Sequence, residues 1–136
     1  MKVLLFATVA FTLASTPSIA ETGEEAYNKL CLSCHLISKE KGVKGIAPPI
    51  FAVKHHVKKA YPNREDFIQT VIDWVEEPST NTSLMSGAVK KFGLMPKLPY
   101  SASDVRKTAE FIYDTNFVLP DWYKKHYKEK HGQNIK

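Results

Sequence analysis

The stretch Cys31-Leu32-Ser33-Cys34-His35 constrains this chain more than any other part of its sequence. Two cysteines that are separated by two residues and followed at once by a histidine are typical of a c-type haem attachment site. Each thiol adds to one vinyl group, so this spacing lets two sulfurs reach one edge of a rigid ring. The imidazole of His35 then lies under the iron and can bind it as the proximal ligand. The motif therefore predicts one haem c, held covalently through Cys31 and Cys34.

A redox-active dithiol and half of a zinc site are the alternatives for this motif. A redox dithiol belongs in a thioredoxin-like βαβ context, which the sequence does not indicate. A closed zinc site usually needs four ligands, and no second Cys or His pair with finger-like spacing follows. Cys31 and Cys34 are also the only cysteines of the chain. The pattern thus favours haem over both alternatives.

Residues 1–20 have the features of a secretory signal peptide. Lys2 precedes a short apolar run, and small residues end the segment at Ala20. The run is short for a membrane span, so an uncleaved anchor is the weaker interpretation. We predict cleavage after Ala20 and a periplasmic or otherwise exported protein, since bacteria attach c-type haem outside the cytoplasmic membrane. The mature chain would lose Lys2, which lowers the formal charge from +5 to +4.

Capping residues and hydrophobic periodicity predict an all-α chain. Thr22, with a glutamate three residues on, has the spacing of a capping box and predicts a helix that runs into the cysteine motif. Asn63, followed by acidic residues, predicts a second helix that ends near residues 76–78. Ser101 precedes a third, with an apolar face. Residues 36–45 predict a loop, and the stretch before the third helix predicts a loop with at most one short helix.

Gly23 and Tyr27 lie eight and four residues before Cys31. In this arrangement the chain resembles the class I c-type cytochromes, from about Gly23 to Asp114. The resemblance implies a small all-α fold of three to five helices wrapped around one covalent haem. It implies that Gly23 lets the first helix cross the last one closely, against an aromatic residue that is Phe111 or Tyr113.

The resemblance also implies the groups on both sides of the iron. The backbone carbonyl of Pro48 would accept the Nδ1 hydrogen of His35, which fixes the ring. Met95, before Pro96, would be the distal ligand. Met85 is the competing methionine.

Two further segments hold candidate groups. His55 and His56 are possible haem ligands, but lysines surround them, and residues 51–61 are better interpreted as a solvated basic segment. Residues 115–136 are an extension beyond the haem domain of residues 21–114, first aromatic and then basic. Trp122 and Tyr123 could hold its first half against the domain, and its last residues look solvated. A docking or membrane-surface role for the extension is an open alternative.

These features favour an electron-transfer protein rather than an enzyme, because protein ligands would fill both iron positions. A haem c subunit of a larger periplasmic oxidoreductase is the main alternative, and a ligand-binding or peroxidase-like haem protein is another. The modest positive charge favours redox partners with acidic docking surfaces, steered by lysines such as Lys39, Lys44 or Lys97. It is too scattered to indicate nucleic acid, and no stable membrane insertion is expected once the signal is cleaved.

Overall fold

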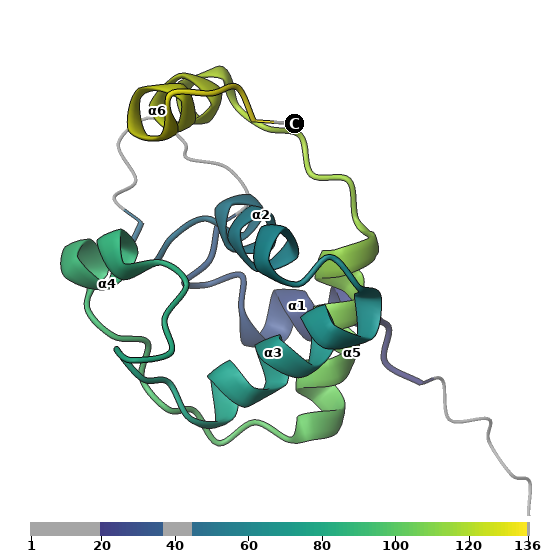
Figure 1. Ribbon diagram of the computed structural model, residues 1–136. Coiled ribbons are helices and arrows are strands. Elements are labelled where there is room, and N and C mark those ends of the chain that lie inside the picture. The colour runs from purple at the N-terminus through teal and green to yellow at the C-terminus, as the bar shows by residue number, and fades with distance from the viewer. Residues whose placement is uncertain (1–19, 37–44, 136) are drawn as a thin grey trace, which may run out of the picture.

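The computed structural model describes residues 20–36 and 45–135, and within these ranges the chain has helices and no strands (Figure 1). The all-α class is confirmed. The signal-peptide prediction and most of the predicted loop after His35, with Lys39 and Lys44, lie outside these residues. The described part forms six helices: α1 Gly23–Leu30, α2 Ile50–Ala60, α3 Arg64–Glu76, α4 Ser86–Phe92, α5 Ala102–Asp114 and α6 Asp121–His131. Five of them fall within residues 21–114, and the sixth belongs to the extension.

Three helices begin at the capping residues that local chemistry predicts. The Thr22 hydroxyl accepts from the backbone N–H of Glu25, whose carboxylate accepts in return from the N–H of Thr22. The Asn63 side chain caps α3, and the Ser101 hydroxyl caps α5. Each cap satisfies backbone donors that the first helical turn leaves unpaired. These predicted helix starts are confirmed.

Helices α1 and α5 cross at Gly23. A Cβ atom at this position would lie 2.7 Å from the Lys107 carbonyl oxygen and 2.9 Å from Cβ of Phe111, so only glycine fits. The Tyr27 ring lies beside the Phe111 ring, with centroids 5.5 Å apart. Phe111 is thus the aromatic residue at the crossing. Tyr113 instead packs edge-on against Phe67 of α3.

The main core lies where α1 and α3 pack against α5, with α2 contributing from one side (Figure 1). Its buried side chains are Tyr27, Ile50, Val57, Phe67, Ile68, Ile72, Val75, Val105, Ala109 and Ile112. Trp74 is half-buried against this core. No helix in the described ranges has the length and apolar character needed to cross a membrane.

The prediction of a solvated segment over residues 51–61 is wrong. These residues form most of α2, and Ile50, Phe51, Ala52 and Val57 are buried. Lys58 and Lys59 are exposed, whereas Lys54 is half-buried and its Nζ donates to the carbonyls of Tyr113 and Thr115 at 2.8 and 2.7 Å.

The extension covers part of α2. Tyr123 and Tyr127 of α6 are 4% and 3% exposed and form a second cluster with Phe51 and Ala52. The Phe51 and Tyr123 rings meet edge-on with centroids 4.8 Å apart. The prediction that Tyr123 lies against the domain is confirmed, and helical structure continues to His131, further than expected.

Candidate haem attachment site

The cysteine motif forms a tight turn at the end of α1. The N–H of Cys31 donates to the carbonyl of Tyr27 at 2.9 Å, which continues the helical pattern. The N–H groups of Cys34 and His35 then donate to the carbonyl of Cys31, at 3.2 and 2.8 Å. Cys31, Cys34 and His35 are all half-buried. One turn of backbone therefore holds both thiols and the imidazole.

The imidazole of His35 is oriented by Pro48. Its Nδ1 atom lies 2.8 Å from the Pro48 carbonyl oxygen, the contact that the resemblance implies. A carbonyl can only accept, so Nδ1 carries the proton and Nε2 keeps its lone pair for a metal. Burial lowers the pKa of His35, while the bond to Pro48 opposes this shift. The neutral ring, which is the ligand form, is therefore favoured.

Two tyrosine hydroxyls hold the backbone of the motif, and sequence reasoning missed both. The Tyr27 hydroxyl donates to the carbonyl of His35 at 2.6 Å, and the Tyr100 hydroxyl donates to the carbonyl of Leu30 at 3.1 Å. Burial, followed by the charge of Cys31, raises the pKa of Tyr27 well above its usual range, so the hydroxyl stays a donor. The i, i+8 spacing of Tyr27 and His35 was a weak local signal. Tyr100 had none, because its partner is 70 residues away.

The two thiols are free of a disulfide. Burial and the nearby charge of Cys34 raise the pKa of Cys31 to about 11. Reactive dithiols have lowered pKa values, because the thiolate is their nucleophile. The environment of Cys31 therefore keeps its thiol protonated near neutral pH. No group of three or more His, Cys, Asp or Glu side chains in the described ranges could hold a metal ion.

The two methionines pack in different places. Met95 is half-buried against the main core, the cluster that Cys31 and Leu32 also contact. Met85 packs against the second cluster, between α2 and α6. The structure therefore associates Met95, and not Met85, with the core that the motif contacts.

The two histidines of α2 belong to the interface with α6. The His55 ring meets the Tyr127 ring edge-on at 4.7 Å, and His56 lies 5.9 Å from His131 between ring centroids. The Nε2 atom of His55 is buried without a hydrogen-bond partner among the described residues. Solvation of these histidines was the wrong expectation, because α6 packs over them.

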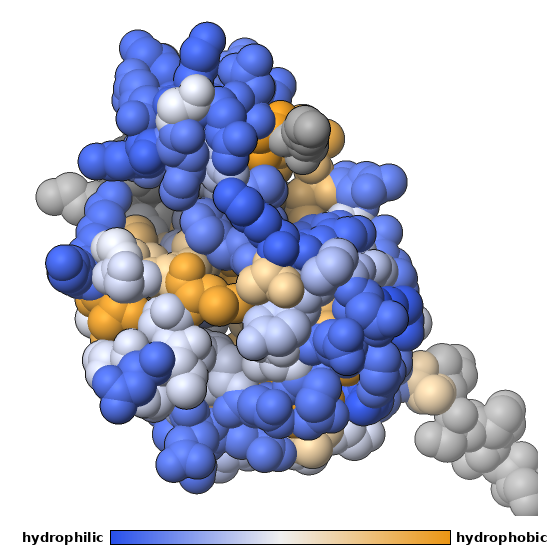
Figure 2. All heavy atoms as spheres, in the orientation of Figure 1, coloured by the Kyte–Doolittle hydropathy of each residue, from blue (hydrophilic) through white to orange (hydrophobic). Residues whose placement is uncertain are grey.

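Several partly exposed apolar side chains pack against the core that Cys31 also contacts. Leu32, Trp74, Met95 and Tyr100 pack against the core but keep part of their surface exposed. Leu94, beside Met95, is 41% exposed. Apolar side chains reach the surface between α4 and α2 (Figure 2). Two thiols could bond to the vinyl groups of haem c, and an imidazole and a thioether are ligands that its iron takes.

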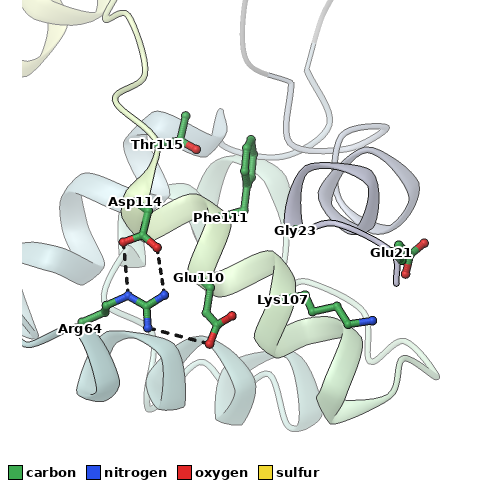
Figure 3. Close-up of a pocket in the computed structure, with 8 residues that line it drawn as sticks. All are labelled: Glu21, Gly23, Arg64, Lys107, Glu110, Phe111, Asp114 and Thr115. Carbon is green, nitrogen blue, oxygen red and sulfur yellow. Dashed lines mark hydrogen bonds and ion pairs between the residues drawn. The ribbon is translucent and has the colours of Figure 1, made fainter. Parts of the chain in front are cut away.

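A separate recess lies between α1, α3 and α5 and contains none of these groups (Figure 3). Its side chains neutralise one another: Arg64 pairs with Asp114 at 2.9 Å and reaches Glu110 at 3.9 Å. We assign it a structural role in joining α3 to α5.

Comparison with protein-family models and with solved structures gave no match. A protein of Aquifex aeolicus (strain VF5), described only as uncharacterized, is 30% identical over 131 residues. The match covers 85% of this chain and 86% of the Aquifex protein. The chain belongs to the family of that protein. The description of the Aquifex protein names no cofactor or partner, so function must be argued from the site.

Proposed function

We propose that the chain is an exported, single-haem c-type cytochrome that carries one electron between redox partner proteins. The observation that carries the proposal is the motif turn, in which two thiols stand beside a histidine whose Nδ1 is bound to the Pro48 carbonyl. This arrangement leaves Nε2 of His35 as a proximal ligand. A dithiol enzyme does not need a histidine oriented in this way. A closed zinc site would use such a histidine but needs four ligands, and no group of three or more His, Cys, Asp or Glu side chains in the described ranges is arranged to hold a metal ion.

The other residues have roles that suit a carrier. Cys31 and Cys34 anchor the ring, and Tyr27 keeps the turn rigid through its bond to His35. Met95 supplies a thioether, a soft ligand that favours reduced iron. When bound, the haem supplies an iron that gains and loses one electron. His35 and Met95 would both hold the iron, and a substrate would then have no vacant site on it.

The test is covalent attachment. We expect the full chain, expressed in a bacterium that can mature c-type cytochromes, to be exported and to have the mass of residues 21–136 plus one haem. The Cys31→Ala/Cys34→Ala variant should lack covalent haem. Ser33→Ala, within the same motif and exposed, should keep it. Haem that extracts into acid acetone from the unmutated protein would overturn the proposal.

A further inference from the structure

Charge is divided between two sides of the molecule. Helices α2 and α6 carry seven lysines and two carboxylates, a formal charge of +5. Helices α1, α3 and α5 carry four basic residues and nine carboxylates, a formal charge of −5. In Figure 1, α6 lies at the top of the view, α1, α3 and α5 lie together below, and α2 lies between, where it also packs against α3 and α5. The two formal charges cancel, so the net charge of the chain does not reveal this division.

The basic side chains of the two sides differ in how many of them form ion pairs. Each of the four on the acidic side makes an ion pair, at N–O distances of 2.8 to 3.6 Å: Lys29, Arg64, Arg106 and Lys107. On α6 only Lys124 does so, with Asp121 at 3.2 Å. Five exposed lysines on the basic side make no ion pair with any residue of the described ranges. Lys58 lies instead over the Tyr113 ring, 4.1 Å from its centroid, and the other four are Lys59, Lys125, Lys128 and Lys130. We call these four the basic face.

Lys59 belongs to the same patch as the end of α6. Burial is the largest cause that lowers the pKa of His131, and the charges of His56 and Lys59 lower it further. The ring centroids of His56 and His131 are 5.9 Å apart, which places the end of α6 beside the second half of α2. The basic face is therefore continuous across α2 and α6.

The packing of α6 favours a protein over a membrane as its partner. A helix that lies in a membrane surface must bury its apolar side in the lipid. The apolar side of α6, Tyr123 and Tyr127, is already buried against α2. The surface over α6 is mostly hydrophilic (Figure 2). The exposed side of α6 carries mainly positive charge.

We propose that the basic face is a docking surface for an acidic protein. Unpaired lysines can bind carboxylates without first breaking an internal ion pair. The acidic side of the molecule repels the same partner, so encounters are oriented as well as attracted. The inference rests on charge and contacts alone, goes beyond the proposed function, and holds whether or not haem is bound.

The test compares two triple variants of the full chain that lose the same charge. K125Q/K128Q/K130Q removes most of the basic face. K90Q/K91Q/K97Q removes three exposed lysines from α4 and the following loop. The probe is poly-L-glutamate, with affinity measured by titration calorimetry at low and at raised ionic strength. Circular dichroism should first show that both variants keep their helices. If K125Q/K128Q/K130Q loses helical structure, the single variants K125Q and K128Q are measured in its place.

We expect K125Q/K128Q/K130Q to bind poly-L-glutamate about tenfold more weakly and K90Q/K91Q/K97Q within about twofold of the parent. Raised salt should weaken parental binding, because exposed charges are screened beyond about 10 Å at 0.1 M. Equal losses in the two triples would overturn the proposal, since net charge alone would then explain binding. Stronger binding to phosphatidylglycerol vesicles than to poly-L-glutamate, at equal anionic charge, would also overturn it and point to the exposed Val118 and Trp122.

Discussion

Two buried tyrosine hydroxyls differ in what they do for the fold. The Tyr27 hydroxyl donates to the His35 carbonyl at 2.6 Å. The Tyr123 hydroxyl is buried with no hydrogen-bond partner among the described residues. Burial raises the pKa of Tyr123 to about 12, so it too stays protonated. One hydroxyl therefore stabilises the candidate site, while the other carries an uncompensated desolvation cost.

We expect Tyr27→Phe to lower the free energy of unfolding by about 1–3 kcal/mol, because it leaves the His35 carbonyl without its donor. Tyr123→Phe should be neutral or stabilising by up to about 1 kcal/mol, because it removes an unpaired polar group. Urea denaturation monitored by circular dichroism measures both. Equal destabilisation by the two substitutions would mean that the bond to His35 contributes nothing.

The proposed distal ligand can also be tested at single residues. If Met95 is the ligand, Met95→Ala should abolish the weak red absorption band from sulfur-to-iron charge transfer. It should also lower the reduction potential and open the iron to carbon monoxide. Met85→Ala should keep the band, because Met85 packs against the second cluster rather than against the core that Cys31 contacts. Visible spectra of the two purified variants show which methionine is the ligand. Loss of the band in the Met85 variant alone would make Met85 the ligand.

At the scale of helices, the crossing of α1 and α5 depends on the missing side chain at Gly23. Gly23→Ala would place a Cβ atom 2.7 Å from the Lys107 carbonyl oxygen, so one helix must move. We expect a loss of about 1–3 kcal/mol in the free energy of unfolding. Gly87→Ala is the matched control, since a Cβ there meets nothing within 4 Å. It should be neutral or stabilising by up to about 1 kcal/mol, because alanine favours helix.

The midpoint and slope of urea denaturation measure this pair. A lower midpoint with unchanged slope is expected for Gly23→Ala. If both substitutions behave alike, helix propensity rather than the close crossing governs Gly23.

The helices differ in how far local sequence predicts them. Helices α1, α3 and α5 begin with side-chain caps, and these starts were predictable. Helices α2 and α6 follow Pro49 and Pro120, and neither has a side-chain cap. Both are rich in lysine, so the sequence does not reveal which of their apolar residues are buried. The contact between the two helices buries them. Tertiary packing, which local patterns do not contain, decides these two elements.

The candidate site divides in the same way. Its chemistry follows from the short spacing of Cys31, Cys34 and His35, and the Pro48 carbonyl followed from a family resemblance. The Tyr100 contact joins residues far apart in the sequence. Local patterns cannot predict such a contact, because the fold alone brings its partners together.

Over the whole molecule, the second cluster attaches α6 through a set of histidines. His55 and His131 both contact the Tyr127 ring, and the His56 ring lies within 6 Å of each of them, at 5.7 and 5.9 Å between centroids. Burial lowers the pKa of His55, and the charges of His56, Lys59 and His131 lower it further. The pKa of His131 is lowered by burial, then by His56, Lys59 and His126. No carboxylate contributes to either shift, so protonation adds positive charge to an already positive interface.

The direction of the pH dependence follows from these shifts. Both histidines bind protons less readily in the folded state than in the unfolded state, where the pKa is near 6.5. Above that value both states are neutral, and the interface keeps its full stability. As the pH falls from 6.5 towards the lower folded pKa values, the unfolded form of α6 gains protons first. Acid should therefore weaken the attachment of α6, whereas the main core of α1, α3 and α5 contains none of these groups.

We expect amide protection factors in α6 to fall between about pH 7.5 and about pH 5.5, while those in α3 and α5 change much less. Hydrogen exchange followed by mass spectrometry, corrected for intrinsic rates, measures each helix separately. The His55→Gln/His131→Gln variant should lose the acid effect, because glutamine does not titrate. His126→Gln, at an exposed position of the same helix, should retain it. If the double variant loosens in acid as much as the parent does, the charge on these histidines does not control α6, and general acid destabilisation explains the result.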